Sequence, residues 1–316
     1  MDDSADPLRR KILAVIVLYK IAPLDSVSFQ TLQASVQQAR QSSAVKIFFY
    51  DNTPGGQPLV PVPGGTTYES HDENRGLAVA YNRALEIAGQ EGFDWLLTLD
   101  QDTSLPLDFV TKLDAATAFA LPIAQVGAIV PRITDKGRVI SPNALSLRMF
   151  PKFFSGDFVG VALEKTTSAV NSASTLRVSA LKAIGGYDPR FWLDYSDAIM
   201  YYRLQKTGFR VFVAGNIRVE HELSVLDMKN RVSYERYEDI LGAESAFWDE
   251  CMGSVAGPAL LLRFSYRLFY KFWRTGGTLP YFRISLRFLM RRMFCSRRRR
   301  MELWQQSVQR RLSSSG

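Results

Sequence analysis

The sequence predicts an α/β protein with a mostly parallel sheet that carries helices on both faces. Short apolar runs rich in β-branched or leucine residues, such as Ile12–Leu18 and Trp95–Leu99, alternate with segments that have a helical pattern of apolar positions. Strands buried on both faces have such continuous apolar runs, and parallel neighbours need a crossover, usually a helix.

The elements follow one another in the order that such a sheet requires. Strands are predicted over residues 12–18, 46–50, 66–70, 95–99, 126–130 and 209–214, and helices over residues 27–39, 77–88, 107–119 and 198–208. Residues 141–160 are turn-rich and aromatic, which favours a loop or hairpin region. Ligands bind beyond the carboxyl ends of the strands in such sheets, and three strands here end in Tyr19, Asp51 and Asp100.

Charge divides the chain into two parts. The 316 residues carry a formal charge of +8, but residues 263–316 hold 14 basic residues and one acid, which leaves −5 on the first 262 residues. This division is the first indication of two functional parts, the second of which includes a basic C-terminal extension. A positive excess of this kind indicates an anionic partner.

Cysteine and histidine usage excludes two kinds of site. Two cysteines, Cys251 and Cys295, are too few for a disulfide framework and favour a reducing compartment. With only His71 and His221, a histidine-rich metal site is excluded. No transmembrane helix or signal peptide is expected, because the longest uncharged stretch is interrupted by proline and Met1–Pro7 is acidic.

Two carboxylates, Asp100 and Asp102, directly follow the predicted strand that ends at Leu99. Carboxylates this close at a strand end can converge on Mg²⁺ or Mn²⁺, which prefer oxygen ligands and often bridge protein to substrate phosphates. The alternative is a solvated turn.

The basic extension contains two amphipathic segments. Arg263, Arg267 and Lys271 recur every four residues within an aromatic-rich stretch, and a second segment repeats the pattern with Arg283, Arg287 and Arg291. These segments are typical of interfacial helices on an anionic membrane surface. The alternative is that their apolar faces pack on the preceding part of the chain. Nucleic acid is not expected as a partner, because no reading motif accompanies the charge.

An ordered series of motifs covers residues 12–225. It comprises Ile12–Tyr19, Tyr50–Asn52, Glu73–Gly76, Ala80–Asn82, Leu99–Asp102, Asn171–Leu176, Ile184–Asp188, Phe191–Asp197, Arg203 and Val219–His221. In this order and spacing, the series resembles the family 2 inverting glycosyltransferases, which have the GT-A fold. It is most similar to their bacterial rhamnosyltransferase branch. Ala173 stands where that branch commonly has glycine. The resemblance implies a catalytic domain over residues 1–225, followed by a basic helical extension over residues 226–316.

The resemblance implies roles for the residues that match. Residues expected to bind the nucleotide-sugar are Tyr19, Asp51, Asn74, Arg75, Gly76 and Asp100. Asp102 would be the principal ligand of Mg²⁺ or Mn²⁺, together with Asp100 and His221. An Asx turn at Asp51, before Thr53-Pro54, is compatible with base binding.

Asp197 stands where this family has its catalytic base, and Asp194 could orient the acceptor or share that role. A carboxylate can take the proton of a sugar hydroxyl as the hydroxyl attacks the anomeric carbon. Inversion follows from one in-line displacement. Alternatively, both acids belong to a first helical turn, where the helix dipole favours them.

We therefore predict a metal-dependent inverting glycosyltransferase that transfers L-rhamnose from dTDP-L-rhamnose to a lipid-linked acceptor in bacterial surface polysaccharide synthesis. It would act as a peripheral protein on the cytoplasmic face of the inner membrane. One alternative is a sugar-nucleotide nucleotidyltransferase, which would need a glycine-rich loop that Tyr19–Pro23 lacks. Another is a catalytically silent membrane adaptor on the same fold.

Overall fold

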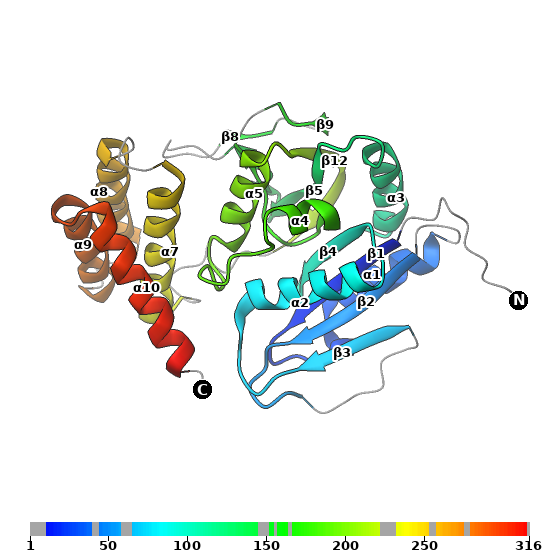
Figure 1. Ribbon diagram of the computed structural model, residues 1–316, viewed down its shortest axis with the longest axis horizontal. Helices are drawn as coiled ribbons and strands as arrows, with labels where there is room; N and C mark the ends of the chain where they lie inside the picture. The colour runs from blue at the N-terminus through cyan, green and yellow to red at the C-terminus, as the bar shows by residue number, and fades with distance from the viewer. Residues whose placement is uncertain are drawn as a thin grey trace, which may run out of the picture.

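The computed structural model describes residues 11–39, 44–57, 65–144, 152–154, 157–163, 166–221, 232–252, 257–274 and 279–314. The strands form a large twisted sheet with helices beside it, and four C-terminal helices gather at one end of the molecule (Figure 1). Within the described ranges, no helix is long and apolar enough to cross a membrane.

Nine of the described strands form one mixed sheet. Its order is β3 (Thr66–Ser70), β2 (Ala44–Asp51), β1 (Lys11–Leu18), β4 (Trp95–Asp100), β11 (Ser174–Arg177), β5 (Val126–Asp135), β12 (Arg210–Glu220) and β9 (Val159–Val161), with β6 (Arg138–Ser141) paired to β5. The first four strands of this order are mutually parallel, as are β5 and β12. Strand β11 is antiparallel to both of its neighbours, β4 and β5. A small separate sheet contains β7 (Asn143–Ala144), β8 (Lys152–Phe153) and β10 (Thr167–Ser168).

Helices cover both faces of the large sheet. In β1, Leu13, Val15 and Val17 point into one buried core, and the alternate residues point into the other. The first core is completed by α2 (Gly76–Gln90), α4 (Val178–Ala183) and α5 (Ser196–Lys206). The second is completed by α1 (Val27–Gln38), which follows the 3₁₀ helix η1 (Pro23–Asp25), and by α3 (Phe109–Ala120). The predicted layers and all the predicted strands and helices of the sheet region are confirmed.

The C-terminal region contains α7 (Tyr234–Met252), α8 (Gly257–Arg274), α9 (Leu279–Phe294) and α10 (Arg297–Ser314). The two predicted amphipathic segments correspond to α8 and α9, whereas α7 and α10 were not predicted. The expected boundary at residues 225 and 226 lies outside the described residues.

Salt bridges fasten these helices to α7. Glu244 of α7 is fully buried and pairs with Arg263, at 2.9 Å from Nε, and with Arg267. Asp249 is also fully buried and accepts a 2.6 Å bond from Arg292 of α9. The side chain of Lys271 lies outside the described residues. Much of the positive charge that distinguishes the extension is thus directed inward, onto acids of α7.

Candidate active site

A cavity of about 590 Å³ opens at the carboxyl ends of β1, β2 and β4. Open α/β sheets bind their ligands at this edge, and the volume is within the range of small-molecule sites. Its lining residues come from the strand ends, from the start of α2, from the segment before β11, from α5 and the segment before it, and from α7. They are Val17, Tyr19, Asn52, Asn74, Gly76, Leu77, Asp100, Gln101, Asp102, Val170, Asn171, Trp192, Leu193, Asp197, His221 and Arg236.

Most of the residues that the sequence singled out meet in this cavity. Three do not line it: Asp51, Arg75 and Asp194. Asp51 is fully buried and holds an Asx turn, because its Oδ1 accepts from the Thr53 N–H at 2.8 Å. Its Oδ2 accepts from the Tyr68 hydroxyl at 2.6 Å. Arg75 is exposed at the start of α2.

The loop before α2 is held by Asn52, a residue to which the sequence analysis gave no role. Its side chain accepts from the Arg75 N–H at 3.1 Å and donates to the Gly76 carbonyl at 3.3 Å. Gly76 has a φ of +80°, and a Cβ there would lie 1.7 Å from Cδ1 of Trp192. Only glycine allows this loop and Trp192 to form one wall of the cavity.

Asp100 and Asp102 are brought next to His221 by the meeting of two chain segments. A β-bridge joins Ser104 to Glu220, so the residue after β12 lies beside the turn after β4. Nε2 of His221 is 3.5 Å from Asp100 Oδ2, and Nδ1 is 3.6 Å from Asp102 Oδ1. The imidazole is buried, whereas the Asp102 side chain is 59% exposed to the cavity and solvent. Two carboxylates of different accessibility therefore flank one imidazole.

The donor set of this cluster fits a divalent cation that shares its coordination with a substrate. Within the part of the chain that the structure describes, no three metal-ligating side chains are gathered around one point, and the two imidazole nitrogens face different carboxylates. Mg²⁺ does not need such a preformed cage, because it is usually held by one or two carboxylates and substrate phosphates. Asp100 and Asp102 could supply those carboxylates.

Asp197 enters the cavity from the first turn of α5. The helix starts after Tyr195, whose φ of 61° lies in the left-handed region that is costly for residues other than glycine. Asp197 Oδ1 accepts from the Ala198 N–H at 2.7 Å. Burial is the main cause that raises the pKa of Asp197 to about 7, and the charges of Asp194 and Asp100 add to it. A carboxyl with this pKa is a stronger base than an ordinary aspartate.

Asp194 is paired with Arg236 of α7, a cavity residue that the sequence analysis missed. The guanidinium contacts both carboxylate oxygens, with Nη2 at 2.8 Å from Oδ1. Burial raises the pKa of Asp194 to about 6, against the effect of Arg236. Asp194 therefore orients the guanidinium of Arg236, which lines the cavity. This role depends on the packing of α7 beside α5, which the sequence does not indicate.

The Trp192 wall of the cavity also depends on the C-terminal helices. The guanidinium of Arg311, in α10, lies 4.9 Å from the ring centre of Trp192 and pairs with Asp239 of α7. Trp192 in turn packs on Gly76. The extension therefore contributes to the cavity as well as to its own helical bundle.

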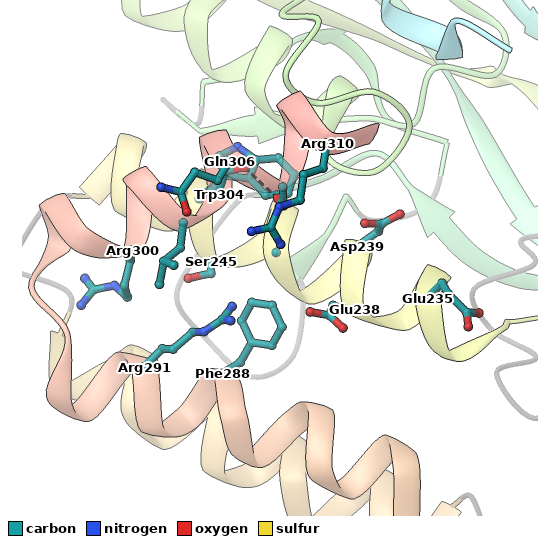
Figure 2. Close-up of a pocket in the computed structure, with 14 residues that line it drawn as sticks. Glu235, Glu238, Asp239, Ser245, Phe288, Arg291, Arg300, Trp304, Gln306 and Arg310 are labelled. Carbon is teal, nitrogen blue, oxygen red and sulfur yellow. Dashed lines mark hydrogen bonds between the residues drawn. The ribbon is translucent and has the colours of Figure 1, made fainter. Parts of the chain in front are cut away.

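A second cavity, of about 320 Å³, lies between α7, α9 and α10 (Figure 2). Acids of α7 lie along one side of it and arginines of α9 and α10 along the other. Several of these groups already pair with one another or with neighbours: Glu238 with Arg287, Asp239 with Arg311, and Arg300 with Asp249. Their charges serve to hold the helices together, and we assign this cavity no ligand.

No protein-family model matches the chain, and no curated protein sequence matches it. Among solved structures, the chain is similar to the crystal structure of GalNAc-T7 with UDP, GalNAc and Mn²⁺. The TM-score is 0.51 and the identity 13%, over 95% of this chain and 57% of that one. This chain thus spans just over half the length of GalNAc-T7.

Two further solved structures are of S. aureus TarS. Residues 1–349 of TarS match with a TM-score of 0.46 and 10% identity, over 87% of this chain and 90% of that one. A longer TarS structure matches with a TM-score of 0.43 and 11% identity, over 87% and 55% of the two chains. Because these scores lie below 0.5, the fold comparison depends on GalNAc-T7. The similarity to GalNAc-T7 confirms the predicted GT-A fold. The structure has the expected mostly parallel central sheet, with flanking helices and additional C-terminal helices.

Proposed function

We propose that this chain is an inverting glycosyltransferase that uses a nucleotide-activated sugar and a divalent cation. The observation that carries the proposal is the convergence of three carboxylates on one cavity: Asp100 and Asp102 after β4, and Asp197, with its raised pKa, at the start of α5. Transfer of a sugar needs both a site for a diphosphate and a base for the attacking hydroxyl.

The residues divide between holding the donor and moving a proton. The nucleotide would lie between the end of β1, at Tyr19, and the loop that contains Asn74 and Gly76, with Asp51 and Arg75 close behind. Bound at Asp100 and Asp102, with His221 beside them, a divalent cation would neutralise the leaving diphosphate.

Two further residues complete the proposed mechanism. Arg236 offers a fixed positive charge to the phosphates, since Asp194 holds its guanidinium in place. Asp197 accepts the proton of the acceptor hydroxyl as the hydroxyl attacks the anomeric carbon from the face opposite the diphosphate. A single displacement of this kind inverts the configuration of the sugar.

We further propose L-rhamnose, from dTDP-L-rhamnose, as the transferred sugar, and a lipid-linked acceptor in bacterial surface polysaccharide synthesis. This choice is supported by the resemblance of Asn171–Leu176 and Phe191–Asp197 to the bacterial rhamnosyltransferase branch. A lipid-linked acceptor would require a peripheral position on the cytoplasmic face of the inner membrane. The similar GalNAc-T7 structure contains UDP, GalNAc and Mn²⁺, which is consistent with the use of a nucleotide-activated sugar and a divalent cation.

A thermal-shift panel of sugar nucleotides, each with Mn²⁺ or Mg²⁺, tests the proposal. A donor present at about 100 times its Kd stabilises the folded chain by about 2.7 kcal/mol. We expect a dTDP-sugar to raise Tm in the presence of the cation, and Asp102→Ala to remove the cation-dependent part of that shift. Asp72→Asn, at an exposed loop carboxylate, is the matched control. If no sugar nucleotide raises Tm, the proposed donor site is wrong.

A transfer assay separates the enzyme from its alternatives. A chelator and Asp197→Asn should each stop transfer from the donor that the panel identifies. Full transfer in chelator would exclude the role of the cation. A sugar-nucleotide nucleotidyltransferase would instead release or consume pyrophosphate, and a silent adaptor would function unchanged with Asp102→Ala and Asp197→Asn.

A further inference from the structure

Two adjacent C-terminal helices expose large apolar side chains along one side. On α8 these are Leu262, Tyr266, Phe269 and Tyr270, with exposures of 64%, 37%, 64% and 42%. On α9 they are Leu279, Leu286, Met290, Met293 and Phe294, with exposures of 51%, 37%, 45%, 55% and 71%. Spacings of three, four and seven residues place each row on one side of its helix. We call the nine side chains together the outer face.

Both rows point away from the rest of the protein. The opposite sides of the two helices are buried against α7, where Phe264 of α8 and Ile284 and Phe288 of α9 share a cluster with Ile240 and Leu241. The two helices also contact one another along their lengths and lie at the end of the molecule farthest from the sheet (Figure 1). The outer face is therefore the outer side of the bundle.

The orientation of α8 is the reverse of that expected for an amphipathic helix at a protein surface in water. Its arginines Arg263 and Arg267 turn inward to the buried carboxylate of Glu244, while phenylalanine, leucine and tyrosine face outward. Soluble monomers rarely expose apolar patches of this extent without a function, and such patches mark a protein or membrane contact.

Exposed arginines lie within and beside the outer face. Arg283 lies on the exposed side of α9, between Leu279 and Leu286. Arg298 and Arg299, whose side chains are 92% and 54% exposed, lie in the first turn of α10, beyond Phe294. Both pair with the one carboxylate of Glu302, so these three side chains together keep a positive charge. A second copy of this chain on the same face would bring these like charges together, which is unfavourable. Anionic lipid head groups are complementary to them, and the interfacial acyl region accepts the apolar side chains.

We propose that the outer face of α8 and α9 is a docking surface for an anionic lipid bilayer. The two helices would lie parallel to the membrane, with leucine, methionine and aromatic side chains in the interface and Arg283 and Arg298 at the level of the phosphates. This inference rests on exposure and charge, and not on the reaction proposed for the cavity.

Co-sedimentation of the full chain with phosphatidylcholine vesicles, with or without phosphatidylglycerol, tests the inference. We expect binding to the anionic vesicles. The double substitutions Leu262→Glu with Phe269→Glu, and Met290→Glu with Phe294→Glu, should each lower the vesicle partition coefficient about tenfold or more. The matched control is Leu107→Glu with Leu163→Glu, two side chains that are 57% and 88% exposed elsewhere on the surface; it should bind as the wild type does.

A charge variant separates the two parts of the surface. Arg283→Gln should weaken binding to the anionic vesicles about fivefold and leave binding to pure phosphatidylcholine unchanged. Circular dichroism and Tm verify folding. If a glutamate pair lowers Tm, the glutamine pair at the same two positions replaces it, Leu262→Gln with Phe269→Gln on α8 or Met290→Gln with Phe294→Gln on α9. The inference is overturned if the wild type stays in the supernatant, or if folded outer-face variants sediment like the control. It is also overturned if sedimentation equilibrium shows a dimer that these variants dissociate.

Discussion

Replacing Asp197 by asparagine should make the protein more stable at neutral pH and inactive in transfer. The carboxylate is held in the wall of the cavity, where burial raises its pKa from 3.8 to about 7. The folded chain must therefore keep an unfavourable negative charge once the pH exceeds 7. Asparagine has nearly the same shape and carries no charge, so it removes this cost.

The magnitude follows from the difference between the two pKa values. At about 1.4 kcal/mol per pH unit, a rise from 3.8 to about 7 corresponds to about 4 kcal/mol. Water in the cavity screens part of the charge, which leaves about 2–4 kcal/mol. Between pH 4 and 7 the folded state binds more protons than the unfolded state, so this residue lowers stability as the pH rises through that window.

Chemical denaturation of wild type and Asp197→Asn at a series of pH values measures this effect. The excess stability of the variant should grow between pH 4 and 7 and stay constant above pH 7. In wild type, kcat/KM for transfer should rise over the last part of this range as the base loses its proton. The variant should still bind the donor.

A difference in stability between wild type and Asp197→Asn that does not change with pH would refute the raised pKa of Asp197. Asp72→Asn, which makes the same change at an exposed loop carboxylate, is the control. Near-normal transfer by Asp197→Asn would separately refute the role of the residue as base. The two readouts are independent, because one follows unfolding and the other follows the chemical step.

Three other substitutions test features of the fold. Gly76→Ala places a Cβ 1.7 Å from Trp192 at a φ of +80°, so the free energy of unfolding should fall by about 3 kcal/mol and the donor-induced Tm shift should disappear. Ala173 has a φ of 60°, so Ala173→Gly should raise the free energy of unfolding by about 0.5–1 kcal/mol in urea denaturation; a fall would contradict the strain argument. Glu244→Gln leaves two arginines facing a neutral group in a buried site, and should cost about 3 kcal/mol, whereas Glu86→Gln, at an exposed ion pair, should cost less than about 0.5 kcal/mol.

The longer strands of the sheet could be predicted from the sequence because each is marked by an apolar run within the strand itself. Runs such as Ile12–Leu18 are apolar on both faces, and the structure buries both faces. Asp100 and Asp102 could be singled out because they directly follow such a run. The antiparallel strand β11 was not predicted, because Ser174–Arg177 is short and has no apolar run of its own. It is a strand because it forms backbone hydrogen bonds with β4 and β5 on its two sides.

Tertiary contacts decide what the sequence could not. The spacing of Arg263 and Arg267 placed them on one side of a helix, but only the position of Glu244 shows that this side faces inward. Likewise, nothing near Arg236 in the sequence connects it with Asp194, which lies 42 residues away. Helix α10 was missed because the arginine run that begins it resembles a low-complexity segment. The positive φ of Ala173 gives a physical reason for glycine at that position.

The place of β11 in the sheet has a consequence for the nascent chain. Strand β4 ends at Asp100, but its partner on one side, β11, starts only at Ser174. At about 5–20 residues per second, translation of the intervening residues takes roughly 4–15 s. During that interval a mostly apolar strand has an unpaired edge, to which another chain could add. We therefore expect the yield of folded protein to depend on how rarely the unpaired edge of β4 meets another chain during synthesis. A chaperone that covers this edge would raise that yield.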